Sequence, residues 1–460
     1  MRRVIFSAAV FAVCFGLVST ARAAEEGVSL TIYTDNFGVV RESRQMTFEE
    51  GVNTKKFTDV ASAIDPTSVN FKCLSSPGAI SVLEQNYEYD LVGTESLLKR
   101  YVDKEVWVNV KGNGADAGRQ VQGNLMAARD NNLIMLNAHG RIEVIDRGSI
   151  ESMVLKEMPQ DLVTKPTLVW LAQAEDEGEE LCQVTYTTGR IGWKADYSAV
   201  LSDDEKSLDF SGWVTIDNKS GATYNDAGIK LIAGDVRRVR PVRPMLREKV
   251  LAMEAAAPAF EEKAFMEYHL YTLGRKSTIK NNQVKQIEFI EPAADVAVKK
   301  LYIYERTQQP EKVQIKLEFE NTEENKLGIA LPKGKVRVFK MDPADETLEF
   351  VGEDEIDHTP RKEKLLLYIG NAFDIVPEYT LVDSRRERRR TTERHKIELR
   401  NRKDMAAEVY VDEKFRGWVN WTIDQATQKY EKRDARTARF KVKIEADSTV
   451  TLEYTATQTW

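Results

Sequence analysis

The chain has 460 residues, of which 42% are hydrophobic and 30% are charged, and its formal net charge at pH 7 is −7. This length predicts two to four domains, and the acidic balance excludes nucleic-acid binding through the global charge of the protein. After residue 23 no run of about 18 apolar residues occurs, which excludes an integral span by a long apolar helix.

The first 23 residues have the pattern of a secretory signal peptide. Arg2 and Arg3 precede an apolar stretch from Val4 to Val18, and residues 21–23 form an A-x-A cleavage site. We therefore expect residues 1–23 to be removed. The mature protein is then exported, either to the periplasm or out of the cell.

Two cysteines remain after that cleavage, Cys73 and Cys182. Export permits a disulfide between them. Whether they pair depends on a distance that the sequence does not contain. We favour the interpretation that both are buried thiols, and the pairing stays open.

Two small units are predicted before residue 158. Residues 24–93 form an N-terminal β domain, because apolar and polar residues alternate in segments such as LTIYTDNFGVVRE. Residues 94–157 begin with a short helix that has Thr94 as its N-cap, and about five short strands follow. One helix and five strands are the pattern of an Sm-like or SH3-like small barrel. That fold has RNA-binding members, but export and acidity argue against a nucleic-acid partner here.

Residues 158–460 predict one large β domain of packed antiparallel sheets, of the β-sandwich type. The period of two is clear in VQIKLEF, where every second residue from Val313 to Phe319 is apolar. Within this domain, residues 237–263 are basic and interrupted by prolines, then rich in alanine, with no periodicity. They predict a mobile loop. The whole chain is therefore expected to be all-β and multi-domain.

Several blocks are familiar in combination: GRIGWKADYSAVLSDDEKSLDF, LGIALPKGKVRVF and GEDEIDHTPRKEKLLLYIGNAFDI in the large domain, and LTIYTDNFGVVRE near the start. Together they resemble the bacterial DUF 4139 domain family of uncharacterised exported proteins. The chain differs from the mucoidy-inhibitor-like branch of that family, in which a helical coiled coil stands where the small barrel stands here. The resemblance implies a fold and a cell-envelope setting. It carries over no catalytic residues, because the family has no established activity.

The stretch VGEDEIDHTPRKEK contains the first candidate site. Asp354, Asp357 and His358 are possible ligands for a divalent ion such as Zn²⁺ or Mn²⁺. The alternative is a turn before a core strand, since the residue before Pro360 is restricted to extended geometry. A histidine in such a turn can hold it by a hydrogen bond. We favour the turn and leave a metal site undecided.

The stretch MEYHLYTL contains the second candidate. Glu267, His269 and Tyr271 lie on one side of a predicted strand, and a histidine beside a carboxylate and a phenol can transfer protons. The alternative, which we favour, is a strand with a half-buried aromatic face and cross-strand partners.

Two further candidates are binding residues. Arg385 and Arg386 open the run SRRERRRTTERHK, whose guanidinium groups match the phosphate or carboxylate groups of an envelope polyanion. The alternative is a solvated strand pair whose charge limits aggregation. In RGWVNWTI, Trp418 and Trp421 have opposite strand parity, so at least one faces outward unless another layer covers it. An exposed indole can stack on a sugar.

No G-x-S-x-G, P-loop or G-x-G-x-x-G stretch occurs, so the sequence indicates no cofactor. We expect a cell-envelope protein of unestablished activity that binds or scaffolds without catalysis. Its expected partner is an envelope protein or a surface glycan. The alternative is a hydrolase with a dispersed carboxylate–histidine site, with or without a metal, and the sequence leaves this question open.

Overall fold

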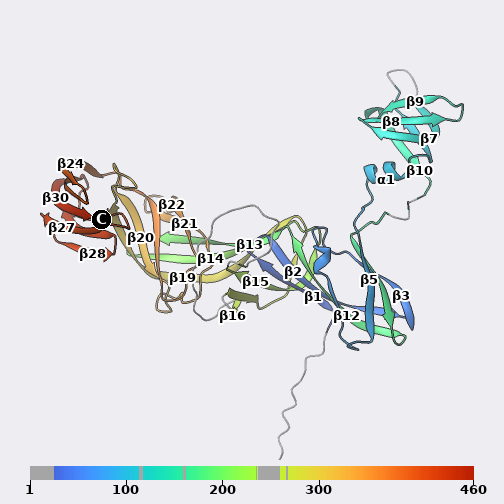
Figure 1. The fold of residues 1–460 in the computed structure, drawn as a ribbon, viewed down its shortest axis with the longest axis horizontal. Coiled ribbons are helices and arrows are strands. Elements are labelled where there is room, and N and C mark those ends of the chain that lie inside the picture. The colour runs from blue at the N-terminus through green and yellow to red at the C-terminus, as the bar shows by residue number, and fades with distance from the viewer. Residues whose placement is uncertain are drawn as a thin grey trace, which may run out of the picture.

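The structure is a computed structural model. It describes residues 25–112, 118–157, 159, 162–234, 236, 260–265 and 268–460, with residues 260–265 described by their backbone alone. The expected signal peptide lies outside these residues. The fold is all-β and multi-domain, as predicted, and the described strands form five sheets. Figure 1 shows an elongated molecule with the C-terminal strands at one end and the small barrel set apart at the other.

The strands of the predicted N-terminal domain share two sheets with strands that follow the small barrel. One of these sheets has eight strands: β1 (Gly27–Tyr33), β2 (Phe37–Phe48), β4 (Asn70–Cys73), β12 (Gly178–Gly189), β15 (Tyr224–Ala233), β16 (Phe260–Phe265), β17 (Tyr268–Leu273) and β18 (Ser277–Ile279). Their order is β16-β17-β15-β1-β2-β12-β4, with β18 paired to β15. The second sheet has the order β3-β11-β5 and contains β3 (Gly51–Thr58), β5 (Ile80–Glu88) and β11 (Thr167–Ala174), and the 3₁₀ turn η1 (Pro66–Ser68) precedes β4.

The small barrel is inserted between β5 and β11, two neighbouring strands of the three-stranded sheet. It contains α1 (Thr94–Arg100), β6 (Glu105–Val110), β7 (Arg119–Arg129), β8 (Asn132–Asn137), β9 (Ile142–Asp146), the 3₁₀ turn η2 (Arg147–Ser149) and β10 (Ile150–Leu155). The strand order is β10-β6-β7-β8-β9, and no ladder within the described part of the chain closes β9 onto β10. The helix and the five strands follow the predicted pattern. The described strands form an open sheet and not a closed barrel, and we keep the name small barrel for residues 94–157.

Two local details of the small barrel matter. The expected N-cap at Thr94 is wrong, because Gly93 has the extended N-cap conformation and Thr94 is the first helical residue, with no side-chain cap. Gly123, in β7, approaches the backbone of Leu136 and Asn137 so closely that a Cβ atom there would clash. A glycine is therefore required at this position, where β7 pairs with β8.

The largest sheet has ten strands. They are β13 (Ile191–Leu201), β14 (Ser207–Asn218), β19 (Gln283–Tyr304), β20 (Gln314–Glu320), β21 (Gly334–Asp342), β22 (Thr347–Ile356), β23 (Lys364–Asn371), β26 (Ala407–Lys414), β28 (Tyr430–Asp434) and β29 (Thr437–Ile444). The main order is β22-β21-β13-β14-β19-β26-β29-β28, and β20 pairs with both β19 and β23. The long strand β19 pairs first with β14 and then, near its end, with β26.

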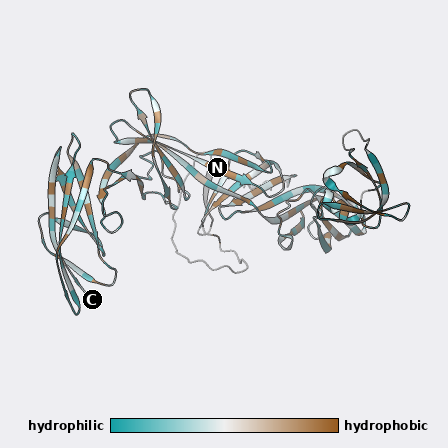
Figure 2. Ribbon diagram, turned by 90° about the horizontal axis from the view of Figure 1, so that it is seen from above, coloured by the Kyte–Doolittle hydropathy of each residue, from teal (hydrophilic) through white to brown (hydrophobic). Residues whose placement is uncertain are grey.

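A four-stranded sheet completes the C-terminal end of the molecule. It contains β24 (Ile375–Glu387), β25 (Arg390–Asn401), β27 (Asn420–Ala426) and β30 (Ser448–Thr459), in the order β24-β25-β30-β27. Its inner face packs on β26, β29 and the end of β19, around a core that includes Tyr304, Phe440 and Tyr454. We call this unit the C-terminal sandwich. Figure 2 shows hydrophobic and hydrophilic bands alternating along its strands.

The other cores follow the same alternation. The largest core joins the eight-, three- and ten-stranded sheets and includes Trp170, Trp193 and Phe210, and the small barrel has a separate core around Leu125. Residues 237–259 of the predicted mobile loop lie outside the described residues. The end of that loop at residue 263 is wrong, because residues 260–263 belong to β16 and pair with β17. No helix in the described ranges is both long enough and apolar enough to cross a membrane.

Candidate functional site

The acidic stretch around His358 forms local backbone contacts. Asp354, in β22, accepts hydrogen bonds from the backbone N–H groups of Tyr368 at 2.7 Å and Glu355 at 2.9 Å. His358 Nδ1 accepts a hydrogen bond from the Lys333 backbone N–H at 3.1 Å. The Asp357 side chain is 94% exposed. Asp354 and His358 therefore hydrogen-bond to the backbone of this turn and its neighbouring strands, which is the arrangement that the alternative interpretation describes.

The same residues are not grouped as metal ligands in the described part of the chain. Asp354 uses both carboxylate oxygens on backbone donors from two strands, and Asp357 faces solvent beside the Lys333 ammonium at 3.7 Å. Among the residues that the structure describes, no three His, Cys, Asp or Glu side chains are grouped closely enough to hold a metal ion.

A cleft of 640 Å³ lies beside this stretch and has two residues that the sequence analysis did not select, Trp193 and Asp196. Asp196 is 7% exposed, and its carboxylate accepts a hydrogen bond from Thr215 Oγ1 at 2.8 Å. Arg337 lies 3.5 Å from its other oxygen. Alternation in GWKADYSAV places Asp196 opposite Trp193 in parity, so the sequence suggested an exposed residue rather than this nearly buried one. The Asp196 carboxylate thus already has a hydrogen-bond donor and a cation beside it, and we assign it a structural role.

The second predicted site belongs to the core. Tyr271 is 1% exposed, donates a hydrogen bond to the Ala330 carbonyl at 3.0 Å, and packs edge-on against Phe289. His269 is half-buried and stacks on Tyr271, with ring centroids 6.4 Å apart. Glu267 lies outside the described residues. The aromatic strand face is thus the arrangement observed, and the Tyr271 hydroxyl is engaged by the backbone.

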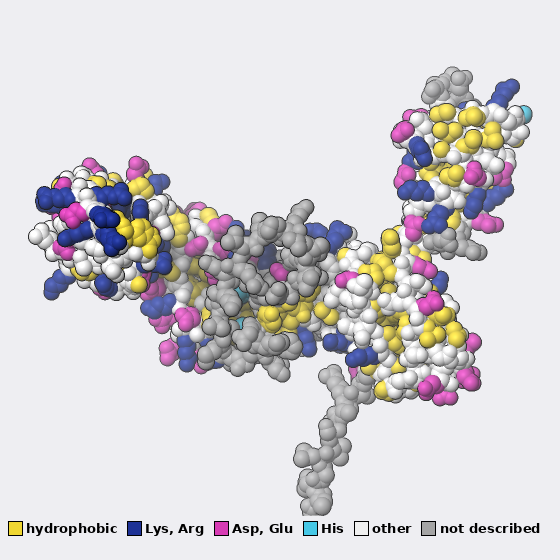
Figure 3. Space-filling model, viewed as in Figure 1, with side chains coloured by type: hydrophobic (Ala, Val, Ile, Leu, Met, Phe, Trp, Pro, Cys, Tyr) yellow, Lys and Arg dark blue, Asp and Glu magenta, His cyan; other side chains and the backbone are white. Residues whose placement is uncertain are grey.

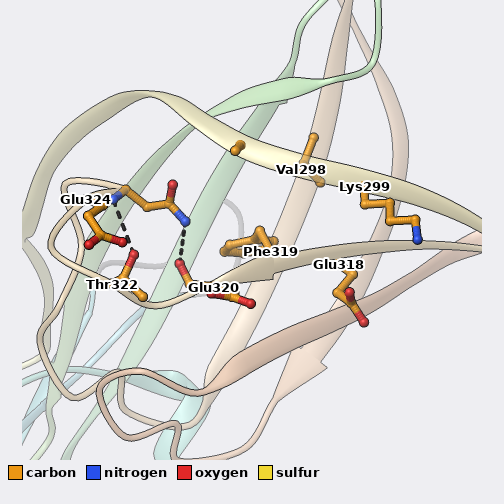
Figure 4. Close-up of a pocket in the computed structure, with 9 residues that line it drawn as sticks. Val298, Lys299, Glu318, Phe319, Glu320, Thr322 and Glu324 are labelled. Atoms are coloured by element: carbon orange, nitrogen blue, oxygen red, sulfur yellow. Dashed lines mark hydrogen bonds between the residues drawn. The ribbon is translucent and has the colours of Figure 1, made fainter.

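A second depression, of 360 Å³, lies between β19, β20 and the loop after β20. Figure 4 shows Glu318 and Lys299 on one side of Phe319, and Thr322 and Glu324 on the other. Glu318 and Glu320 both lie near the Lys364 ammonium, at 3.5 Å and 3.4 Å, so these two carboxylates are already paired with a cation.

The remaining candidates come together at one end of the C-terminal sandwich. The pairing of Glu387 with Arg390 makes Arg388 and Arg389 a two-residue turn between β24 and β25. All residues from Leu381 to Arg390 are exposed. Arg385 lies 3.3 Å from Asp383. Within the described part of the chain, no carboxylate pairs with the other arginines of this hairpin, which are Arg386, Arg388, Arg389 and Arg390.

Two tryptophans lie at the same end of the sheet as the arginine hairpin, because β30 lies between β25 and β27. Thr459 pairs with Arg390 on one side and Asn420 on the other. The next residue, Trp460, donates its backbone N–H to the Arg389 carbonyl at 3.2 Å. Trp418, just before β27, contacts Trp460 with ring centroids 5.7 Å apart.

Both of these indoles reach solvent, since Trp418 is 61% exposed and Trp460 is 39% exposed. Trp421 is 6% exposed and stacks on Phe415 in the core. Trp418 is thus the outward residue of the two, although it lies in the turn before β27 and strand parity does not apply to it. We call the combined feature the Arg–Trp surface; it consists of Arg385, Arg386, Arg388, Arg389, Arg390, Trp418 and Trp460. Figure 3 shows basic side chains gathered beside hydrophobic ones at this end of the molecule.

Buried ion pairs hold the sandwich beneath this surface. Arg439 donates two hydrogen bonds of 2.7 Å to Asp412, whose side chain is 2% exposed. Glu413 joins Arg306 at 2.7 Å and the Tyr454 hydroxyl at 2.7 Å. Breaking such a pair leaves a buried charge, so these contacts fix one arrangement of β19, β26, β29 and β30.

His395 lies next to this network and is buried. Its side chain stacks on Tyr454, with ring centroids 4.8 Å apart, and Nδ1 lies 3.0 Å from the Tyr379 hydroxyl. Burial lowers the pKa of His395 below its ordinary value, and the Glu413 carboxylate opposes this only in part. Of the chain's described histidines, His395, which the sequence analysis did not select, is the one that is buried.

The chain matches no protein-family model and no curated protein significantly.

Proposed function

We propose that this chain is an exported, non-enzymatic binding protein of the cell envelope that holds an anionic surface glycan on its Arg–Trp surface. One observation carries the proposal: an exposed indole pair lies against an arginine hairpin in which four arginines have no carboxylate partner among the described residues. The N-terminal sequence and the resemblance to the DUF 4139 domain family support the envelope setting.

The chemistry of the two residue types favours an acidic sugar polymer. A guanidinium group forms paired hydrogen bonds with a carboxylate or phosphate. An indole presents a flat apolar face that fits the C–H face of a sugar ring. A plain polyanion needs only the first of these groups, and a neutral glycan needs only the second. Both together match a polymer that carries sugar rings and acidic groups.

The shape of the surface also favours a polymer over a small molecule. A small-molecule site is usually a concave cavity that encloses most of its ligand. Here the arginines occupy a protruding hairpin in which every residue from Leu381 to Arg390 is exposed. Such a surface gains affinity by contacting several repeating units along a chain.

The hydrolase alternative has weaker support. The cleft of 640 Å³ brings Asp196, Asp354 and His358 to one lining. However, Asp196 and Asp354 accept hydrogen bonds from Thr215 and from backbone N–H groups, and His358 Nδ1 accepts one from Lys333. A general acid or base requires a carboxylate or an imidazole nitrogen that is not engaged by such bonds and that points at the reacting group.

The experiment is a titration of the purified mature chain with polygalacturonate, with neutral dextran and inorganic polyphosphate run in parallel. The proposal predicts saturable binding of polygalacturonate that weakens with salt, no binding of dextran, and weaker binding of polyphosphate. Equal binding of polyphosphate and polygalacturonate would reduce the site to a plain polyanion surface. No binding of either acidic polymer would reject the proposal.

A further inference from the structure

Cys73 and Cys182 lie directly opposite each other in the sheet, at the end of the short edge strand β4. Both are buried and both are free thiols in this structure, which agrees with the interpretation favoured from the sequence. Two buried thiols at directly opposed positions of neighbouring strands are a stronger feature than two isolated buried cysteines.

The register places these cysteines in the narrow type of cross-strand pair. The next pair along the ladder is Leu74 with Leu181, and the Leu74 N–H donates to the Leu181 carbonyl at 2.8 Å. Hydrogen-bonded and non-hydrogen-bonded pairs alternate in an antiparallel ladder, so Cys73 and Cys182 form a non-hydrogen-bonded pair. The Cα atoms of such pairs are about 4.5 Å apart. This separation lies within the range of about 4.4 to 6.8 Å that a disulfide spans.

We propose that Cys73 and Cys182 form an intramolecular disulfide when the folded chain meets a small disulfide oxidant, with Cys73 reacting first and Cys182 second.

The surroundings of the two thiols differ in a way that sets this order. Cys73 Sγ donates a hydrogen bond to Glu180 Oε2 at 3.3 Å. Hydrogen bonds from Ser75 and Ser76 hold the pKa of Glu180 below its ordinary value, so this carboxylate is ionised where it meets the Cys73 thiol. Burial raises the pKa of Cys182 to about 12, and its side chain is fully buried. Cys73 is 8% exposed on the edge strand β4, so it is the thiol that an oxidant reaches first.

The reaction balances as two thiol–disulfide exchanges. The Cys73 sulfur releases its proton to water and attacks the oxidant, so one S–S bond forms as the oxidant's own S–S bond breaks. The first departing thiolate takes up a proton from water. The Cys182 sulfur then attacks the mixed disulfide, and its proton goes to the second departing thiolate. The protein loses two electrons and two protons, and one oxidant disulfide becomes two thiols.

The bond would join parts of the molecule that are far apart in sequence. Between Cys73 and Cys182 the chain contains β5, the small barrel and β11. Strand β4 has only four residue pairs with β12, so it has few backbone hydrogen bonds of its own. A crosslink there closes a long loop and restricts the unfolded chain, which stabilises the fold.

The test uses the wild-type mature chain and glutathione disulfide as the oxidant. After reaction, free thiols are alkylated and the protein is digested with trypsin without reduction. The expected product is peptide 73–99 joined to peptide 157–190, with a mass about 2 Da below the sum of the two. The oxidised protein should melt at a higher temperature than the reduced one. Recovery of both peptides fully alkylated, from protein that stayed folded, would overturn the proposal.

Three variants test the assigned order. Cys182→Ser should accumulate glutathione on Cys73, and Cys73→Ser should leave Cys182 unmodified. Glu180→Gln should speed disulfide formation at neutral pH and shift its pH profile to lower pH, because a negative charge beside Cys73 opposes formation of its thiolate. Glutathione found on Cys182 in Cys73→Ser, with none on Cys73 in Cys182→Ser, would reverse the assigned order and contradict this part of the proposal.

Discussion

Trp418 and Trp460 form an exposed edge-to-face pair, with ring planes at 82° to each other. The two residues are 42 positions apart in sequence and meet because Thr459 pairs with Asn420 in β27 and with Arg390 in β25. The same pairing places the arginine hairpin beside them. The proposed binding of a sugar polymer assigns a role to these two exposed indoles.

The first prediction concerns Trp418→Ala. Removing this indole should weaken binding of polygalacturonate about tenfold, because one stacking face is lost. Its melting temperature should be unchanged, since the side chain is 61% exposed. Calorimetric titration measures the affinity. The matched control is Trp213→Ala, which removes another exposed tryptophan from β14 in the ten-stranded sheet and should leave binding intact.

The second prediction concerns Arg386→Gln. Loss of one unpaired guanidinium should weaken binding about tenfold and reduce its dependence on salt. Arg402→Gln is the control, because Arg402 follows the opposite end of β25 and pairs with Asp447 at 2.7 Å. Equal losses in both variants would mean that net charge, and not the hairpin, determines binding.

The third prediction concerns the buried pair of Asp412 and Arg439. Arg439→Met removes two hydrogen bonds from a carboxylate that is 2% exposed, and Arg433 at 3.1 Å replaces them only in part. We expect a local loss of about 3 kcal/mol. Amide hydrogen exchange in β26 and β29 should then be faster by a factor on the order of 100.

The control for that variant is Lys443→Met, on the same strand β29. Lys443 is 69% exposed and pairs with Glu445 on the surface, so exchange should not change. A parent-like exchange pattern in Arg439→Met would show that the buried pair contributes little to the sandwich.

The fourth prediction is a pH dependence set by His395. Its folded pKa is lowered by burial, so between the unfolded value of 6.5 and the folded value the unfolded chain binds more protons. Stability from this group is complete above pH 6.5 and falls as the pH drops toward the folded pKa. The melting temperature of the C-terminal sandwich should therefore decrease from about pH 7.5 to about pH 5.5.

The groups that face His395 are Glu413, Arg306, Glu393 and Tyr379. His395→Gln should flatten this pH dependence, while His139→Gln, at an exposed turn of the small barrel, should retain it. An unchanged slope in His395→Gln would assign the effect to other groups.

The fifth prediction concerns metal content. His358 and Asp354 are occupied by backbone N–H groups, so the purified chain and His358→Ala should contain the same trace amounts of metal by mass spectrometry. A stoichiometric metal that His358→Ala loses would restore the hydrolase interpretation and locate its site.

Local alternation was enough to predict the strands and many core residues. Leu208, Phe210, Val214 and Ile216 alternate in sequence, and all four are buried although the register against β19 shifts between them. These features depend on the side-chain period of a strand, which is a property of a short segment.

Sheet partners could not be predicted in the same way. The parallel pairing of β1 with β15 joins residues about 200 positions apart, and no local pattern specifies it. The same limit hid the Arg–Trp surface, because its hairpin and its tryptophans are brought together only by β30. It also hid the register that places Cys73 opposite Cys182.

The most direct measurement of the central claim is a calorimetric titration of polygalacturonate into the mature chain and into the double variant Trp418→Ala/Arg386→Gln. The account predicts saturable binding by the parent chain and a loss of about 100-fold in the folded double variant, since the two contacts act on one ligand. Equal affinity of the two proteins, or no binding by the parent chain, would contradict it.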